Sequence, residues 1–189
     1  MRLVAPAAEH LASYEAALRR GWSPDNIRLE VAIAEELGRI ASDPADFLAV
    51  LNDTGRGGPI TLPDGSQVPR LPGFRRWMWD GEICGSIGFR WQPPGAELPP
   101  WVLGHIGYAV VPWKRRAGIA TRALALLLDE IRQLGLGHVD LTTDPDNLPS
   151  QRVITANGGM LVERFRKPAY GNTEGLRFRI ALTPAAGRR

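Results

Sequence analysis

The sequence predicts a mixed α/β (α+β) fold with a mostly antiparallel central sheet, on three observations. Two helical patterns precede any substantial strand. Residues 74–79 and 82–91 then flank Asp80-Gly81, the strongest short-range signal for a two-residue hairpin turn. Finally, a strand, a long helix and a second strand follow one another within residues 102–142, and such a unit normally holds its two strands parallel.

The first fifty residues are expected to be mainly helical. Residues 2–4 fit a short strand, and residues 7–20 carry apolar side chains at helical spacing. A second helical pattern covers residues 29–40. It is followed by Asp43-Pro44, where Asp43 can cap a shorter helix that runs through Leu51.

The remaining elements follow from turn residues and periodicity. Residues 53–73 are dense in glycine and proline, which predicts a loop with at most a small hairpin. Residues 102–111 favour a central strand that Pro112 stops, and residues 116–134 form an amphipathic helix that closes at Gly135. The rest of the chain predicts a strand at 138–142, a short helix at 149–157, and strands near 160–165 and 176–181.

Composition favours one ordinary globular domain, residues 1–189, with 44% hydrophobic and 23% charged residues. No apolar run is long enough for a membrane span, and Glu9, His10 and Glu15 stand where a signal peptide would be apolar, so a cytoplasmic protein is expected. The single cysteine, Cys84, cannot form an internal disulfide, and no residues stand at metal-ligand spacing. Neither a metal nor a membrane partner is therefore expected.

The formal charge of +3 is compatible with a polyanionic ligand but is too small to indicate nucleic-acid binding. A nucleic-acid module that uses Arg164, Arg166 and Lys167 remains an alternative, although no recognisable motif supports it. A homodimer is the default expectation for the oligomeric state.

The segment 107–121 is the most informative one, because a strand there runs into a short loop and then a helix N-terminus. Unpaired N–H groups and the positive end of the helix dipole make such a point an anion site. Gly118 lets a pyrophosphate approach the backbone, Ala120 keeps the next turn clear, and Arg115 and Arg116 supply charge-assisted hydrogen bonds. Such a loop would suit any nucleotide diphosphate. Neither a P-loop nor a Rossmann fingerprint is present in the sequence.

The spacing Arg-x-x-Gly-x-Ala at 115, 118 and 120 resembles the coenzyme A motif of the GNAT superfamily of N-acetyltransferases. A second segment, 144–159, is similar to the other GNAT signature, with Asn147 three residues before Ser150 at a helix start and a glycine at the helix end. Closer still, the His105-Ile106-Gly107-Tyr108 run and the closing Asn157-Gly158-Gly159 resemble a bacterial subgroup of predicted acetyltransferases.

This resemblance covers about residues 74–181 and implies a sheet of six to seven strands with a splayed parallel pair, flanked by about four helices. It divides the chain into N-terminal helices and loop (1–73), a cofactor-binding core (74–181) and a tail (182–189). It also implies acetyl-CoA as co-substrate and a small-molecule or peptide amine as acceptor, with direct attack of a primary amine on the thioester.

Carried over by position, the resemblance implies that the amides of Ala109, Val110 and Val111 pair with the pantetheine arm. The Val110 amide would also stabilise the oxyanion. Asn147 would hydrogen-bond the pantetheine arm, and Ser150 could cap its helix while touching the cofactor. The pyrophosphate would fall on the loop and first helical turn, at Arg115, Arg116, Ala117, Gly118, Ile119, Ala120 and Thr121.

The resemblance does not assign the proton-transfer residues. His105 is the best candidate for the general base, and the competing interpretation is a histidine hydrogen-bonded within the sheet. Many family members use a tyrosine as general acid where this chain has Ile154, so the acid is unassigned and a coenzyme A-binding protein without transferase activity is an alternative function. Arg90, at a strand end, could bind an acidic substrate but is interpreted as simply exposed.

Overall fold

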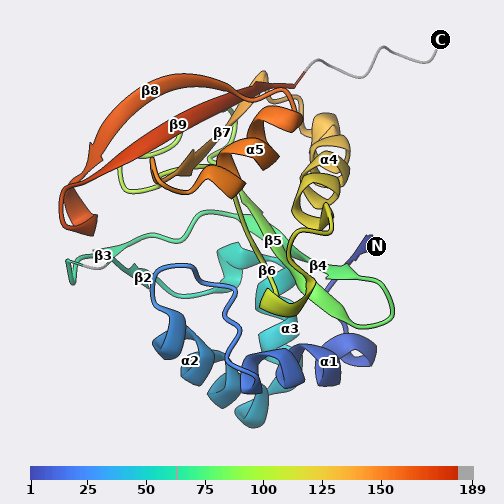
Figure 1. Ribbon diagram of the computed structural model, residues 1–189. Coiled ribbons are helices and arrows are strands. Elements are labelled where there is room, and N and C mark those ends of the chain that lie inside the picture. Colours follow the sequence, from blue (N-terminus) through green and yellow to red (C-terminus); the bar gives the residue numbers. More distant parts are fainter. Residues whose placement is uncertain (63, 183–189) are drawn as a thin grey trace.

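The computed structural model describes residues 1–62 and 64–182, so residues 183–189 of the predicted tail lie outside it (Figure 1). Its helices are α1 (Ala8–Arg19), α2 (Leu29–Ser42), α3 (Pro44–Asn52), α4 (Ile119–Ile131) and α5 (Leu148–Ala156). Its strands are β1 (Arg2–Val4), β2 (Ile60–Thr61), β3 (Gln67–Val68), β4 (Gly73–Trp79), β5 (Ile83–Arg90), β6 (Ile106–Val110), β7 (His138–Thr143), β8 (Met160–Lys167) and β9 (Thr173–Ala181). None of the described helices has the length and apolarity that a bilayer crossing needs.

The strands form two larger antiparallel sheets, with the orders β1-β4-β5-β6 and β7-β9-β8, and a small β2-β3 hairpin. The larger sheets contain seven strands in the described residues, which agrees with the predicted six to seven. The small hairpin lies inside the loop predicted at 53–73. Five described helices surround the sheets instead of about four. The mixed, mostly antiparallel fold is therefore confirmed.

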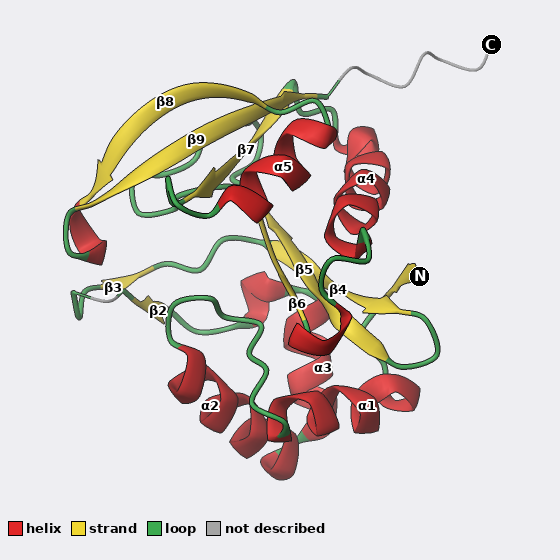
Figure 2. Ribbon diagram, viewed as in Figure 1, coloured by secondary structure: helices red, strands yellow, loops and turns green. Residues whose placement is uncertain are grey.

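The two larger sheets meet where β6 and β7 lie beside each other without pairing. They are linked near the start of β6. There the backbone N–H of His105 donates to the carbonyl oxygen of Asp140 at 2.7 Å, and the N–H of Asp140 donates to Nδ1 of His105 at 2.9 Å. From this link the two strands diverge, as Figure 2 shows. β6 is thus an edge strand of its sheet, with outward N–H and C=O groups that no strand of the described chain uses.

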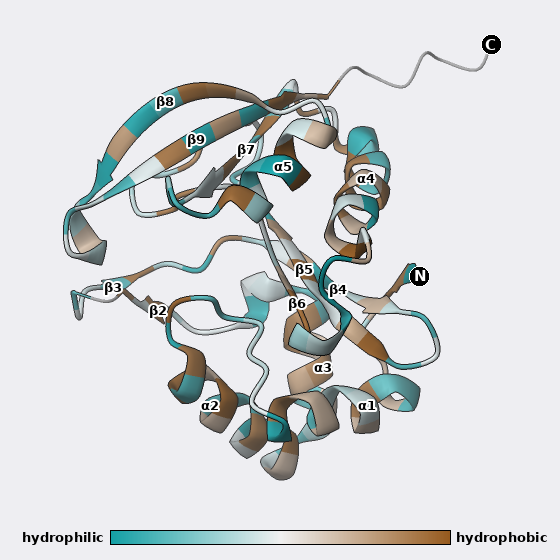
Figure 3. Cartoon of the chain, viewed as in Figure 1, coloured by the Kyte–Doolittle hydropathy of each residue, from teal (hydrophilic) through white to brown (hydrophobic). Residues whose placement is uncertain are grey.

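Helical layers cover both faces of the β1-β4-β5-β6 sheet. On one face, Leu124 of α4 is buried in the same cluster as Ile87 of β5. On the other, Tyr14 of α1 stacks on Trp77 of β4 with ring centroids 4.5 Å apart, and Phe47 of α3 packs beside them. Successive side chains of β6 enter these two clusters in turn. α4 carries both hydrophobic and hydrophilic residues, as expected of a helix with one face on a sheet (Figure 3).

Two strand predictions need correction. The β4–β5 hairpin has a three-residue connection, 80–82, because the pairing register shifts between Met78 and Trp79. The strand predicted at 102–111 is confined to β6. Before it, the N–H of Val102 closes a turn onto Pro99, and the His105 amide turns toward β7.

The long helix begins later than predicted, at Ile119 instead of 116. Arg116 and Gly118 both have positive φ, 63° and 70°, which is incompatible with a right-handed helix. At its other end, α4 passes into a short 3-10 helix, and Gly135 closes it in the left-handed conformation with φ 72°, as predicted.

Candidate active site

The first turn of α4 is open to solvent and lacks a cap of its own. Gly118 occupies the N-cap position, no side chain accepts from the first amides, and the first turn holds no acidic residue. The residues from Arg115 to Gly118 are all exposed. Uncapped N–H groups at the positive end of a 13-residue helix attract an anion, so the structure supports the predicted character of this loop.

The three consecutive basic residues before the helix have different roles. Lys114 pairs with Asp80 at 2.6 Å and with Glu82 at 2.9 Å, so it holds the β4–β5 turn. Arg115 donates from Nε to the carbonyl oxygen of Val110 at 3.3 Å. Arg116 has no hydrogen-bond or ion-pair partner among the described residues, and its positive φ is a strained conformation of the kind found at ligand sites. Arg116 is therefore a cation that remains available at the helix start.

The backbone groups of β6 alternate between β5 and the open edge. The N–H of Val111 donates to the carbonyl oxygen of Cys84 on β5, at 3.0 Å. The carbonyl oxygen of Tyr108, on the opposite side, accepts from Nδ2 of Asn26 at 3.0 Å. Because the N–H and C=O of one strand residue point the same way and reverse at the next residue, the amides of Tyr108 and Val110 face the open edge.

This alternation shows which of the three predicted amides, those of Ala109, Val110 and Val111, faces the open edge of β6. Val110 lies on the open edge, as its predicted contact with a thioester oxygen requires. The prediction for Val111 is wrong, because its amide is bonded to β5. Ala109 pairs with Ser86, and by the same alternation its amide also faces β5. The amide of Tyr108 also faces the open edge, and the sequence did not predict a role for it.

The start of α5 forms the other side of the diverging strands. Asn147 caps α5, since its Oδ1 accepts from the N–H of Ser150 at 3.1 Å, and its Nδ2 has no partner among the described residues. The prediction that Ser150 caps the helix is therefore wrong. Oγ of Ser150 lies 2.9 Å from the hydroxyl of Tyr108, so this pair links β6 to α5. Ile154, at the position of the family's tyrosine acid, is buried.

His105 lies in the interior at the link between the two sheets. Its side chain is fully buried, and Nδ1 accepts from the N–H of Asp140. Nε2 is also buried and has no partner in the described chain. Desolvation by burial lowers the pKa of His105 to about 4. This geometry favours the second interpretation of His105, a histidine hydrogen-bonded within the sheet.

The protonation of His105 makes the stability of the fold depend on pH. Between pH 6.5 and 4 the unfolded chain binds a proton that the folded chain excludes, so the free energy of unfolding should fall as the pH drops through this window. We expect a loss of about 2 kcal/mol between pH 7 and pH 5 from this group. In His105→Asn, which keeps an acceptor for Asp140, urea unfolding at the two pH values should lack this loss. Equal pH dependence in both proteins would contradict the assignment.

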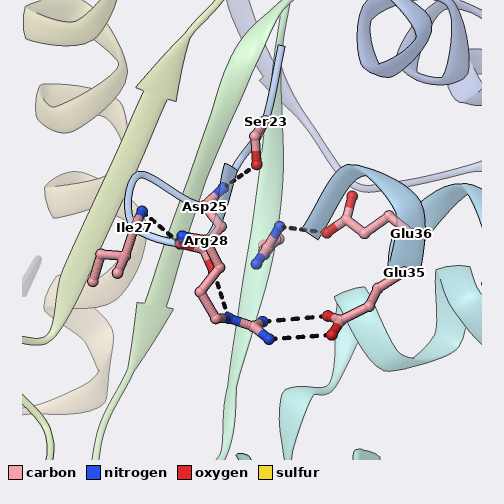
Figure 4. Close-up of polar contacts among 7 residues, drawn as sticks. Ser23, Asp25, Ile27, Arg28, Glu35 and Glu36 are labelled. Atoms are coloured by element: carbon pink, nitrogen blue, oxygen red, sulfur yellow. Dashed lines mark hydrogen bonds and ion pairs between the residues drawn. The ribbon is translucent and has the colours of Figure 1, made fainter. Parts of the chain in front are cut away.

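A second polar cluster lies on the face of the sheet that α1 and α2 cover. Asp25, in the loop before α2, accepts from the N–H groups of Ile27 and Arg28 (Figure 4). Arg28 also donates both Nη groups to the carboxylate of Glu35, at 3.2 and 3.3 Å.

Further along α2, Glu36 accepts from the hydroxyl of Tyr14 at 2.5 Å and from Arg75 of β4 at 3.3 Å. Burial raises the pKa of Tyr14, so its hydroxyl remains a donor. No local motif marks the contacts of Glu36, because Tyr14 and Arg75 both lie far from it in the sequence. Among the described residues, no group of histidine, cysteine or acidic side chains could hold a metal ion.

Comparison with known proteins identifies the family. Residues 59–158 match the family model described as the acetyltransferase (GNAT) family, which is more than half of the chain. The chain therefore belongs to the GNAT acetyltransferases. No curated protein sequence matches significantly.

Solved structures share this fold at low sequence identity. A Vibrio cholerae spermidine N-acetyltransferase chimera has a TM-score of 0.59 and 12% identity, over 96% of this chain and 97% of that one. A ribosomal L7/L12 alpha-N-protein acetyltransferase in complex with coenzyme A has a TM-score of 0.58 and 16% identity, over 95% and 92%. The microcin C7 self-immunity acetyltransferase, in complex with acetyl-CoA and AMP, has a TM-score of 0.57 and 13% identity, over 95% and 91%.

Proposed function

We propose that this protein is an N-acetyltransferase that moves the acetyl group of acetyl-CoA to a primary amine of a small molecule or peptide. One observation carries the proposal: the open-edge amide of Val110 stands a few residues before the uncapped N-terminus of α4. Free N–H groups of a strand edge are thus followed along the chain by a helix start that can bind an anion. Two of the solved neighbours hold coenzyme A or acetyl-CoA, which supports the same ligand for this fold.

In this proposal the pyrophosphate binds the amides of residues 116–121. Gly118 leaves space beside the helix start, and Arg116 adds a charge-assisted hydrogen bond. The pantetheine arm lies beside the open edge of β6, and its thioester carbonyl reaches the free N–H of Val110 as a neighbouring strand's acceptor would. Nδ2 of Asn147 is available to the same arm from the side of α5.

Acetyl-CoA supplies the activated acetyl group, and the chain supplies position and electrostatic stabilisation. The neutral amine first adds to the thioester carbonyl carbon and forms the new C–N bond. The C–S bond then breaks, and the sulfur leaves as coenzyme A thiolate, which takes a proton from water to give the free thiol. The amide of Val110 donates to the oxyanion that develops on the carbonyl oxygen. The proton of the amine passes to water, because His105 is buried. Holding both substrates in one orientation provides much of the rate enhancement.

The test is a direct assay of binding and transfer. Calorimetry should detect acetyl-CoA binding, and radiolabelled acetyl-CoA should give a labelled amide and one free thiol per transfer with at least one amine in a broad panel. Binding without any transfer would instead support the coenzyme A-binding protein that does not catalyse. Absence of binding would reject both functions.

Direct attack also predicts that the only cysteine is dispensable. Cys84 is fully buried, and burial raises the pKa of its thiol to about 11, so it stays protonated and out of reach. Cys84→Ala should keep kcat within about threefold, since it removes only a small core side chain. Intact-protein mass spectrometry after incubation with acetyl-CoA should show no acetylated enzyme. An acetyl group trapped on Cys84 would indicate a covalent intermediate and contradict direct attack.

A further inference from the structure

Arg90, the last residue of β5, holds its guanidinium over the backbone of the neighbouring strand. A Cβ built on Gly107 of β6 would stand 3.2 Å from Nη2 of Arg90, so the absence of a side chain at 107 makes room for this group. Arg90 is exposed to solvent. Its neighbour on β4, Arg75, is paired with Glu36, whereas Arg90 makes no ion pair with a described residue. It is an accessible cation with an unused guanidinium.

The charges around Arg90 favour an added anion. Although Arg90 reaches the solvent, the surrounding chain partly shields its guanidinium from water and lowers its pKa, and the positive charges of Arg75 and Arg70 lower it further. Tyr170, from the β8–β9 connection, and Asp25, from the loop before α2, act in the opposite direction. The two other arginines are the stronger influence, so a negative group would relieve repulsion among three cations.

The acidic side chains of the polar cluster beside α2 already have other hydrogen-bond or ion-pair partners. Asp25 accepts from two backbone amides of its own loop, and Glu35 is held by Arg28. Glu36 is shared by Arg75 and Tyr14. Each acid is therefore fixed by groups other than Arg90, and an anion for Arg90 has to come from outside the described chain.

The position of Arg90 relates it to the proposed reaction centre. Gly107 stands three residues before Val110 on β6, so the guanidinium lies about 10 Å along the strand from the proposed oxyanion donor. We propose that Arg90 binds an anionic group, a carboxylate or a phosphate, on the amine acceptor, and so selects acidic acceptors over polycationic ones. This inference rests on the proposed function.

Paired acceptors that differ in one anionic group test the inference. Glycylglycine is compared with glycylglycinamide for a carboxylate, and phosphoethanolamine with ethanolamine for a phosphate, with spermidine as the polycation. The wild type should acetylate at least one anionic member with a kcat/KM about tenfold or more above its uncharged partner, because a hydrogen-bonded charge pair contributes on this scale. The pair that shows the preference identifies the anion.

Arg90→Gln should remove this preference and leave kcat/KM for the uncharged partner within about threefold, with the effect mainly in KM. Arg132→Gln, which removes an exposed arginine beyond the far end of α4, is the control and should keep the preference. A preference that persists in Arg90→Gln overturns the inference. So does a wild type that binds acetyl-CoA and acetylates only uncharged or polycationic amines. Failure of the proposed function gives a different result, because acetyl-CoA then either does not bind in calorimetry or binds without transfer to any amine of the broader panel.

Discussion

Gly118→Glu should weaken acetyl-CoA binding by at least about 100-fold, or about 2.7 kcal/mol. Gly118 is the N-cap of α4 with φ 70°, and a Cβ there would meet no described atom within 4 Å, so the new side chain projects into the space proposed for the pyrophosphate. A carboxylate at this point repels the phosphates and competes for the same amides. Isothermal titration calorimetry with acetyl-CoA measures the change directly.

The other end of the same helix provides a matched control. Gly135 also has positive φ, 72°, and equally open surroundings, so Gly135→Glu introduces the same strain and the same charge far from the loop. It should lower the melting temperature at least as much as Gly118→Glu, because a carboxylate is unfavourable at a helix C-terminus, and leave acetyl-CoA affinity within about threefold. Gly118→Ala isolates the strain from the charge. Unchanged affinity in Gly118→Glu would reject the proposed pyrophosphate site.

Several helix features could be predicted because the residues that determine them are close together in the sequence. The apolar stripe of α4, the glycine that closes it and the Asp43 cap of α3 depend on residues within a few positions of one another, and each appears as expected. The predicted start of α4, at residue 116, is three residues before the observed start at Ile119. Arginine rarely adopts positive φ, so the residue type at 116 does not predict a left-handed turn there.

The direction of the β6 amides could not be read from the sequence. Three consecutive strand residues offer amides to alternate sides, and which side faces β5 depends on register. The bond from Val111 to Cys84 sets that register, and it joins residues far apart in the chain. A one-residue shift would have placed Ala109 and Val111 on the open edge.

The polar contacts between β4 and α2 could not be predicted for a related reason. Arg75 and Glu36 are 39 positions apart, and neither stands in a recognisable motif. The contact of Arg90 with Gly107 exists only because β5 and β6 pair in one particular register. A sequence pattern that predicts a cofactor loop therefore says little about the proposed acceptor site, where residues of several elements meet.

Val110→Pro should lower kcat about 100- to 1,000-fold, because it removes the one amide proposed to stabilise the oxyanion. The substitution suits this position: the amide of Val110 faces an unpaired strand edge, and proline is tolerated in strands at such edges. Affinity for coenzyme A should fall by less than about tenfold, since the ground state loses a single neutral hydrogen bond. Single-turnover kinetics with acetyl-CoA and calorimetry with coenzyme A separate the two effects.

The contrast between rate and affinity is what distinguishes a catalytic amide from a binding one. An interaction made mainly in the transition state lowers kcat when it is removed, whereas uniform binding raises KM alone. Val110→Ala keeps the amide and trims the side chain, so it should retain kcat within about fivefold. If Val110→Pro and Val110→Ala lose the same activity while both still bind coenzyme A, the packing of the side chain would explain the loss, and the oxyanion would have to be stabilised elsewhere.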